Sequence, residues 1–342
     1  MDTSPLLFDL GKSRPTTREI ADLVKAGGAD ALTDATRRAD AARYQEVTCR
    51  SALNRVKGMP FDWTLNPYRG CTHGCHYCYA RRYHTQFELG ADDEFASIIF
   101  VKTNFVEVLR RELRKPSWQG EYVAVGTATD CYQPIEGHYK LTRRSLEALC
   151  ELRNPVGVIT KGPMIVRDKD VLAELSRTAG CSVYVSVPTV DEEAWRQLEP
   201  GTAHPLQRLR AVRELVDSGV RAGVLMSPIV PGISSKPAIL ERTMKAIADH
   251  GARFVGCNVM FLEGGTRDHF MRWLSQEFPQ LVDSYTLLYA GKYAPASYRT
   301  DVQAVVSLLR TKYGMGTRGR DEDGTTKQGQ TTESEQQMLE WK

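Results

Sequence analysis

The amino-acid sequence predicts an α/β fold, an open (β/α)6 partial barrel of parallel strands. Five short, mainly apolar runs alternate with segments whose apolar residues recur at helical spacing, and residues 61–70 are counted as a sixth strand before them. The runs are apolar rather than alternating, as expected of parallel strands buried on both faces. Strand–helix units of this length join parallel neighbours through right-handed crossovers. The strands are expected at residues 61–70, 121–129, 156–160, 181–187, 221–230 and 253–262.

Helical segments follow the last five of these strands. Each carries apolar residues three and four positions apart, which places them on the one face that packs against the sheet. Together with the strands they predict a partial TIM barrel, whose functional residues lie at the carboxyl ends of the strands. The helices are expected at residues 142–153, 169–179, 206–219, 236–251 and 267–278.

The segments on either side of the predicted barrel have a different composition. Residues 1–50 are polar with one helical pattern, and we interpret them as an N-terminal extension. Residues 314–342 contain few aliphatic residues and many Gly, Thr, Gln and charged residues, which predicts a disordered tail. The barrel domain is therefore expected to span residues 51–313.

Overall composition is that of a water-soluble enzyme. The chain has 342 residues, 42% hydrophobic and 25% charged, with a net charge of +3. This small positive net charge is compatible with an anionic partner but does not indicate one. Neither a long apolar run nor a secretory signal is evident, so we expect no membrane segment. We expect a cytoplasmic protein, in which thiols stay reduced.

Three of the eight cysteines lie in one short stretch, "NPYRGCTHGCHYCYAR", with the spacing C-x3-C-x2-C. They are Cys71, Cys75 and Cys78. Loops of this kind hold an iron–sulfur cluster or a zinc ion. A zinc site would need a fourth ligand, which His73, His76 or His84 could supply. No second C-x2-C or H-x3-H pair lies nearby, and a large parallel sheet needs no metal to fold, so the sequence favours the cluster.

The motif resembles that of the radical S-adenosylmethionine superfamily. This resemblance implies a [4Fe–4S] cluster on Cys71, Cys75 and Cys78, with one iron open to the amino and carboxylate groups of S-adenosylmethionine. It also implies reductive cleavage to a 5′-deoxyadenosyl radical, which abstracts hydrogen from a substrate. Tyr77, the aromatic residue before the third cysteine, would lie near the adenine. The electron would come from reduced ferredoxin or flavodoxin.

Further segments narrow the resemblance. "GTATDCYQPIEGHYKLTRRSLEAL", "ITKGPMIVRDKDVLAEL", "VSVPTVDEEAWRQLEPGTAHPLQRLRAVREL" and "GVLMSPIVPGI" are similar to the spore photoproduct lyase-like group (the DNA repair photolyase cluster), in its uncharacterised bacterial subgroup. The similarity covers about residues 45–312. It implies that the hydroxyl–acid pair Thr129–Asp130 replaces a Gly-Gly-Glu stretch at the cofactor. Lys161 would hold the methionine carboxylate, and Ser186 would be another polar contact.

One departure concerns the hydrogen donor. The lyase places a donor cysteine where this chain has Thr127, whose hydroxyl hydrogen is far harder to abstract. Cys131 lies nearby in "TDCYQP" and is a candidate for a displaced donor. The main hypothesis is therefore a radical enzyme acting on an unknown substrate. The alternatives are a lyase that repairs thymine dimers in DNA, and a zinc-binding module without activity.

Charged residues outside the cysteine loop give two further expectations. The basic runs at 110–115 and 142–144 are interpreted as solvated helix faces, so a nucleic-acid substrate is open but not favoured. Arg81, Arg82 and Tyr83 are candidates to face a phosphate-bearing substrate. Glu199 and Arg208 are expected to form an ion pair that orients the loop after the fourth strand.

Overall fold

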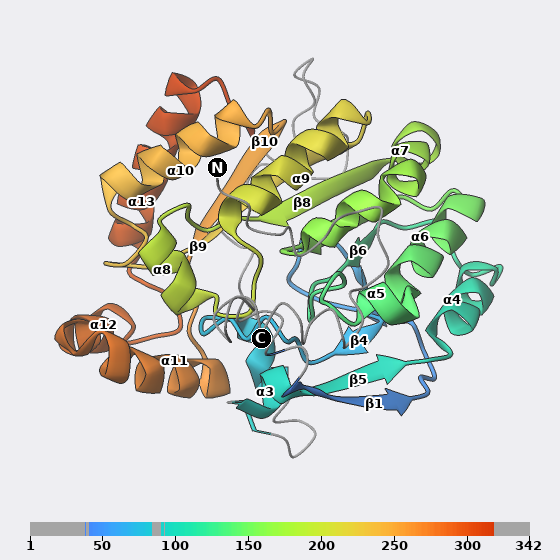
Figure 1. The fold of residues 1–342 in the computed structure, drawn as a ribbon, viewed down its shortest axis with the longest axis horizontal. Helices are drawn as coiled ribbons and strands as arrows, with labels where there is room; N and C mark the ends of the chain where they lie inside the picture. Colours follow the sequence, from blue (N-terminus) through green and yellow to red (C-terminus); the bar gives the residue numbers. More distant parts are fainter. Residues whose placement is uncertain (1–37, 39–40, 84–89, 92, 318–342) are drawn as a thin grey trace, which may run out of the picture.

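A parallel sheet forms the centre of the molecule. The computed structural model describes residues 38, 41–83, 90, 91 and 93–317. Within them, eight strands pair in the order β11-β10-β9-β8-β7-β6-β3-β2, and this linear order leaves the sheet open (Figure 1). The strands are β2 (Leu53–Arg55), β3 (Trp63–Leu65), β6 (Val123–Val125), β7 (Val156–Thr160), β8 (Cys181–Ser186), β9 (Arg221–Ile229), β10 (Phe254–Val259) and β11 (Gly316–Thr317).

Five of the six predicted parallel strands are confirmed as β6 to β10, and β3 corresponds to part of the sixth. Each pairs in parallel with its neighbour, whereas β2 runs antiparallel to β3 at one edge. Apolar side chains are buried along the central strands, as the unbroken apolar runs predict. The predicted α/β class and open barrel are therefore both present.

Helices cover the outer face of the strands (Figure 1). The five predicted helices are α6 (Leu141–Glu151), α7 (Lys169–Thr178), α9 (Pro205–Asp217), α10 (Pro237–Asp249) and α11 (Gly264–Glu277). The structure adds α3 (Asp93–Ser97), α4 (Phe105–Leu113), α5 (Glu136–Tyr139), α8 (Glu192–Leu198), α12 (Val282–Leu288) and α13 (Ala296–Lys312). Across the described ranges, none of these helices is long and apolar enough to cross a membrane.

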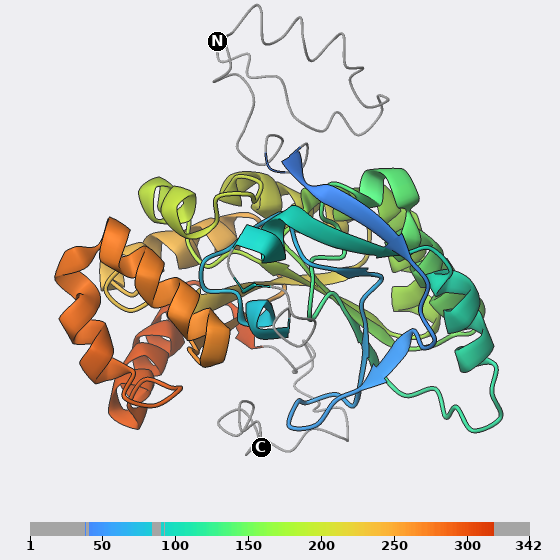
Figure 2. The ribbon, with the colours of Figure 1, turned by 90° about the horizontal axis from the view of Figure 1, so that it is seen from below.

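The predicted first strand at 61–70 is wrong as a single strand. It divides into β3 in the main sheet and β4 (Tyr68–Arg69) in a smaller sheet with β5 (Ile98–Lys102) and β1 (Arg43–Val47). Pro67 lies between the two strands, and it has no N–H group with which to continue a ladder. Figure 2 shows β1 and β5 side by side, to one side of the main sheet.

The two flanking segments are described only in part. Arg43–Val47, the end of the expected N-terminal extension, pairs with β5, and Gly316–Thr317, the start of the expected tail, pairs with β10. The rest of the expected disordered tail, residues 318–342, lies outside the described residues. The domain boundaries at 50 and 313 stay predictions.

Candidate active site

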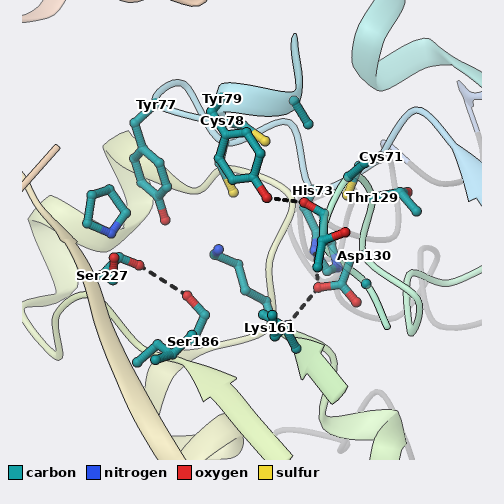
Figure 3. Close-up of a pocket in the computed structure, with 18 of the residues that line it drawn as sticks. Cys71, His73, Tyr77, Cys78, Tyr79, Thr129, Asp130, Lys161, Ser186 and Ser227 are labelled. Carbon is teal, nitrogen blue, oxygen red and sulfur yellow. Dashed lines mark hydrogen bonds and ion pairs between the residues drawn. The ribbon is translucent and has the colours of Figure 1, made fainter. Parts of the chain in front are cut away.

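A cavity of about 280 Å³ lies at the carboxyl ends of the parallel strands. The cysteine loop closes one side, and residues at the ends of β6 to β10 form the other (Figure 3). Its polar and sulfur-bearing lining residues include Cys71, His73, Cys75, Tyr77, Cys78, Tyr79, Thr127, Thr129, Asp130, Lys161, Ser186, Ser227 and Asn258. The structure therefore brings together every candidate residue for the cluster and the cofactor.

The three cysteines of the motif all line this cavity, and all are free thiols. Gly70 makes the entry to their loop possible, because its φ is +79° and a side chain there would lie 2.5 Å from the Ile98 carbonyl oxygen. Burial raises the pKa of the thiols of Cys75 and Cys78. Thiolates at these positions therefore need a cation, which bound iron would supply, so the residues present fit a cluster held by three cysteines.

A single metal ion fits the same residues poorly. Among the residues that the structure describes, no group of three or more His, Cys, Asp and Glu side chains could hold one ion. His73 Nδ1 lies 3.3 Å from Asp130 Oδ2, and His76 Nδ1 lies 3.0 Å from His269 Nε2. The third zinc candidate, His84, lies outside the described residues. A cluster differs from a single ion because each thiolate binds its own iron atom, so the three sulfurs need not meet at one point.

Asp130 supports one side of the cysteine loop. It accepts hydrogen bonds from Thr160 Oγ1 at 2.6 Å and from the Lys161 backbone N–H at 2.6 Å, and it faces His73. Burial alone would lower the pKa of His73, but Cys71 and Asp130 raise it to about 10. The pair is therefore ionic, and it ties the loop to the ends of β6 and β7.

Glu199 supports the other side. Its Oε1 accepts a hydrogen bond from the Tyr77 hydroxyl, and its Oε2 accepts one from Arg208 Nη2 at 2.5 Å. The ion pair expected between Glu199 and Arg208 is thereby confirmed. Two main-chain hydrogen bonds also join the segment around Glu199 to the cysteine loop. His76 N–H donates to the Leu198 carbonyl at 3.1 Å, and Gly201 N–H donates to the His73 carbonyl at 3.0 Å.

Lys161 extends from the end of β7 into the cavity, with its amine between Tyr77 and the Asp130 side chain (Figure 3). The ammonium lies 5.5 Å from the centroid of the Tyr77 ring and 3.9 Å from Glu199 Oε1. Burial alone would lower the pKa of Lys161, but Cys75 and Glu199 raise it, so the side chain stays cationic. It can attract an anionic ligand group into the cavity.

Thr129 and Ser186 line the cavity but use their hydroxyl protons within the protein. Thr129 Oγ1 donates to the Gly70 carbonyl at 2.5 Å, and Ser186 Oγ donates to the Ser227 carbonyl at 3.2 Å. Toward a ligand in the cavity, both oxygens can still accept a hydrogen bond, although Thr129 Oγ1 already accepts one from Gln133 Nε2 at 3.1 Å.

Cys131 is not brought to the cavity. Its buried thiol points to the Ile159 carbonyl, 3.7 Å away, and it does not line the cavity wall. Thr127 does line it, and the carbonyl of Thr127 accepts a hydrogen bond from the Tyr79 hydroxyl. The spacing in "TDCYQP" places Cys131 close in sequence, but its thiol lies behind Gly126 and Ile159, which form the cavity wall.

The expectation that Arg81 faces a substrate is wrong. Its buried guanidinium donates to the carbonyls of Cys75 at 3.0 Å and Gly74 at 2.6 Å, so it braces the cysteine loop. Arg82 does line the cavity, paired with Glu263 at 2.7 Å. A buried arginine often donates to the free carbonyl oxygens of a turn. The sequence after Cys78 does not indicate that Arg81 has this role.

Sequence reasoning also missed three other residues of the site. Asn258, at the end of β10, lines the cavity beside the residues already named. Tyr79 bonds across the cavity to Thr127, and Gly201 touches the cysteine loop. Tyr79 and Gly201 lie in quoted motifs, "CYAR" and "LEPGT", but neither position by itself indicates what it contacts.

Comparisons with known proteins agree with this geometry. The model of the Radical SAM superfamily matches residues 65–243. An uncharacterized protein of Mycobacterium tuberculosis is 39% identical over 280 residues, which cover 81% of this chain and 82% of that protein. The Radical SAM Nalpha-GlyT isomerase of Pseudomonas phage M6 is 25% identical, over 73% of this chain and 51% of the phage protein.

A solved structure shares the fold. Spore photoproduct lyase complexed with dinucleoside spore photoproduct has a TM-score of 0.63 and 13% sequence identity, and the match covers 82% of this chain and 83% of that one. The likeness supports the partial barrel fold.

Proposed function

The chain belongs to the radical SAM superfamily, and from that premise we propose that it abstracts hydrogen from a substrate held at the barrel mouth. Its cofactors are S-adenosylmethionine and a [4Fe–4S] cluster. When bound and reduced, the cluster supplies one electron that cleaves S-adenosylmethionine to a 5′-deoxyadenosyl radical. The observation that carries the proposal is that three thiols, two of them buried and that of Cys78 half-buried, line the same cavity as the half-buried ammonium of Lys161.

We assign the residues as follows. Cys71, Cys75 and Cys78 hold the cluster, and Lys161 binds the methionine carboxylate through its charge. Thr129 and Ser186 accept hydrogen bonds from the cofactor, and Tyr77 lies beside the adenine. With substrate bound, a site between the strand ends and the cysteine loop would exclude water, which protects a radical from quenching. Reduced ferredoxin or flavodoxin is proposed as the electron donor.

Two other functions have less support. Thymine-dimer repair would need a thiol hydrogen donor at the cavity, and apart from the three motif cysteines no cysteine lines the cavity in the described part of the chain. A zinc module would need a fourth ligand, and both described histidine candidates have other partners. We therefore propose a radical reaction on a substrate that does not depend on such a thiol.

The test is the formation of 5′-deoxyadenosine. The protein is loaded with iron and sulfide without oxygen, reduced with dithionite and given S-adenosylmethionine, with Cys75→Ala as the matched control. We expect product from the wild type and none from the variant, which should also lack the brown chromophore. A variant that keeps a full cluster would remove Cys75 from the ligand set. A fully loaded wild type that neither binds nor cleaves S-adenosylmethionine would refute the proposal.

A further inference from the structure

Glu199 is a buried carboxylate that does not line the cavity but contacts two residues that do. Only 3% of its surface is exposed. Its Oε1 accepts the hydrogen bond of the Tyr77 hydroxyl and lies 3.9 Å from Lys161 Nζ. Glu199 therefore reaches a bound ligand through its contacts with the tyrosine and the lysine, and otherwise only through its charge.

Arg208 holds Glu199 from behind. It is fully buried, and besides its 2.5 Å bond to Glu199 it donates to the Ser186 carbonyl at 2.8 Å and the Ala203 carbonyl at 2.9 Å. Thr202 Oγ1 also donates to the Glu199 carbonyl at 3.0 Å. Because Ser186 ends β8, while Thr202 and Ala203 lie in the loop before α9 and Arg208 in α9 itself, the carboxylate is fixed relative to the sheet.

Lys161 is held in a different way. Within the described residues its ammonium has no hydrogen-bond acceptor, since Glu199 Oε1 at 3.9 Å is too distant for a hydrogen bond. What holds it is the charge of Glu199 together with the face of the Tyr77 ring, 5.5 Å away. Its N–H groups therefore remain available for an anion in the cavity.

We propose that Glu199 is a positioning residue for the cofactor. It fixes the Tyr77 ring through the hydroxyl, and through that ring and its own charge it places the Lys161 ammonium where the methionine carboxylate binds. This inference rests on the proposed function, because it takes S-adenosylmethionine as the ligand. It goes beyond that function in assigning a role to a residue outside the cavity.

For Glu199→Gln, the proposal predicts a change in carboxylate binding opposite to the change expected from the loss of charge alone. Glu199→Gln removes a negative charge near the site, so charge alone would tighten the binding of a carboxylate. If Glu199 positions Lys161, the same substitution frees the ammonium and leaves it close to an unpaired Arg208. Binding of the carboxylate should then weaken, by about tenfold if one charged contact is lost.

A matched control lies elsewhere in the chain. Glu136 is also fully buried, accepts a hydrogen bond from the Tyr68 hydroxyl at 2.5 Å and pairs with Arg167 at 2.8 Å. Neither Glu136 nor Tyr68 lines the cavity. Glu136→Gln and Tyr68→Phe therefore disturb a buried group of the same composition without touching the cofactor site.

The experiment measures equilibrium binding to cluster-loaded protein without oxygen, using S-adenosylmethionine and 5′-deoxyadenosine as probes. Glu199→Gln should weaken S-adenosylmethionine binding about tenfold. Binding of 5′-deoxyadenosine, which has no carboxylate, should not change. Tyr77→Phe should show a smaller effect of the same kind, and it carries the test if Glu199→Gln does not fold. The two control variants should bind both probes like the wild type.

Several results would overturn the inference. Unchanged or tighter S-adenosylmethionine binding in Glu199→Gln would show that the carboxylate does not position Lys161. Equal weakening for both probes, or equal weakening in the controls, would show a general loss of structure. If the wild type binds S-adenosylmethionine and the variants match it, the inference alone fails. If the wild type does not bind it, the proposed function fails as well.

Discussion

Two buried groups of the same composition, Tyr–Glu–Arg, occur in this chain and differ in their surroundings. In the cavity group, Tyr77 bonds to Glu199, which pairs with Arg208. In the second, the sheet group, Tyr68 of β4 bonds to Glu136 of α5, which pairs with Arg167. The sheet group joins the smaller sheet to the barrel, whereas the cavity group joins the cysteine loop to β8 and α9.

The difference lies in the balance of charge. Arg167 divides its guanidinium between Glu136 and Asp168. Arg208 pairs with no acid other than Glu199 among the described residues, and Lys161 adds a second cation. Burial raises the pKa of Glu136 in spite of its hydrogen bonds. Burial would also raise the pKa of Glu199, but Arg208 and Lys161 outweigh it and lower the pKa.

This contrast shows that composition does not decide what a buried acid does. Hydrogen bonds within the protein hold the carboxylate of the sheet group. Its role is structural, because it joins the smaller sheet to the barrel. The carboxylate of the cavity group carries one negative charge and has two cations nearby, Arg208 and Lys161. The surplus cation, Lys161, is the one that faces the ligand cavity.

The largest expected effect comes from breaking the attachment of the cavity group to the cysteine loop. In Gly201→Ala, the new Cβ would lie 2.3 Å from the Thr72 carbonyl oxygen and 2.8 Å from that of His73, so the backbone must shift. We expect loss of most iron and sulfide, and about 3 kcal/mol of destabilisation. Gly291→Ala, where a Cβ would meet nothing within 4 Å, is the control. Metal analysis that finds a full cluster in Gly201→Ala would refute the attachment.

Removing Lys161 tests the charge balance around Glu199 without altering the pair that Glu199 forms with Arg208. Lys161→Ala should keep the cluster, since the lysine is not a ligand, but weaken S-adenosylmethionine binding by about 2 kcal/mol. Lys169, on α7, is an exposed residue that pairs with Glu214. Lys169→Ala should therefore leave S-adenosylmethionine binding unchanged. Wild-type affinity in Lys161→Ala, measured by equilibrium dialysis, would exclude the lysine from the site.

The pKa shifts predict opposite pH trends for the two acids. The folded pKa of Glu199 lies below its ordinary value of 4.5, so the stability lost in Glu199→Gln should be full above pH 4.5 and shrink as the pH falls. The folded pKa of Glu136 lies above 4.5, so the loss in Glu136→Gln should be largest below pH 4.5 and shrink as the pH rises.

Urea unfolding of the metal-free variants and wild type, in a pH series on both sides of 4.5, measures these trends. Each pKa unit corresponds to about 1.4 kcal/mol, which such titrations detect. Parallel trends for the two variants would mean that Lys161 and Arg208 do not stabilise the charge of Glu199.

The smallest effect is expected where neither group is touched. Deleting residues 318–342 should change the free energy of unfolding by about 0.5 kcal/mol or less. Cutting after Tyr313 should cost somewhat more, because Met315 N–H bonds to the Arg310 carbonyl at 2.9 Å and Gly316–Thr317 pairs with β10. A large loss from the first deletion would show that the tail contributes to the fold.

The barrel could be predicted because its signals are local. The run at 156–160 forms β7 with the expected ends, since a strand buried on both faces is apolar at every position. The first strand failed because the division at Pro67 depends on β5, whose sequence lies about thirty residues later. Likewise the amphipathic face of α13 was not interpreted as an element, and of α4 only the basic run at 110–115 was interpreted as helical.

The candidate site could be predicted in its chemistry but not in its contacts. The spacing of Cys71, Cys75 and Cys78 is visible in sixteen letters, and the cavity brings them together. The bond between Tyr77 and Glu199 joins residues 122 positions apart, and no local pattern encodes it. The sequence does not show the direction of a side chain either, which is why Cys131 and Arg81 were candidates for a cavity that neither lines.

The main-chain bonds between the cysteine loop and the Leu198–Gly201 segment have a consequence for biosynthesis. A chain is made from its N-terminus, so the three thiols leave the ribosome well before the segment that shapes their loop. Until α8 has emerged, His76 and His73 lack the partners that hold the loop. We therefore expect iron and sulfide to enter only after the first four barrel strands have assembled, and a nascent chain stalled before residue 198 should acquire none.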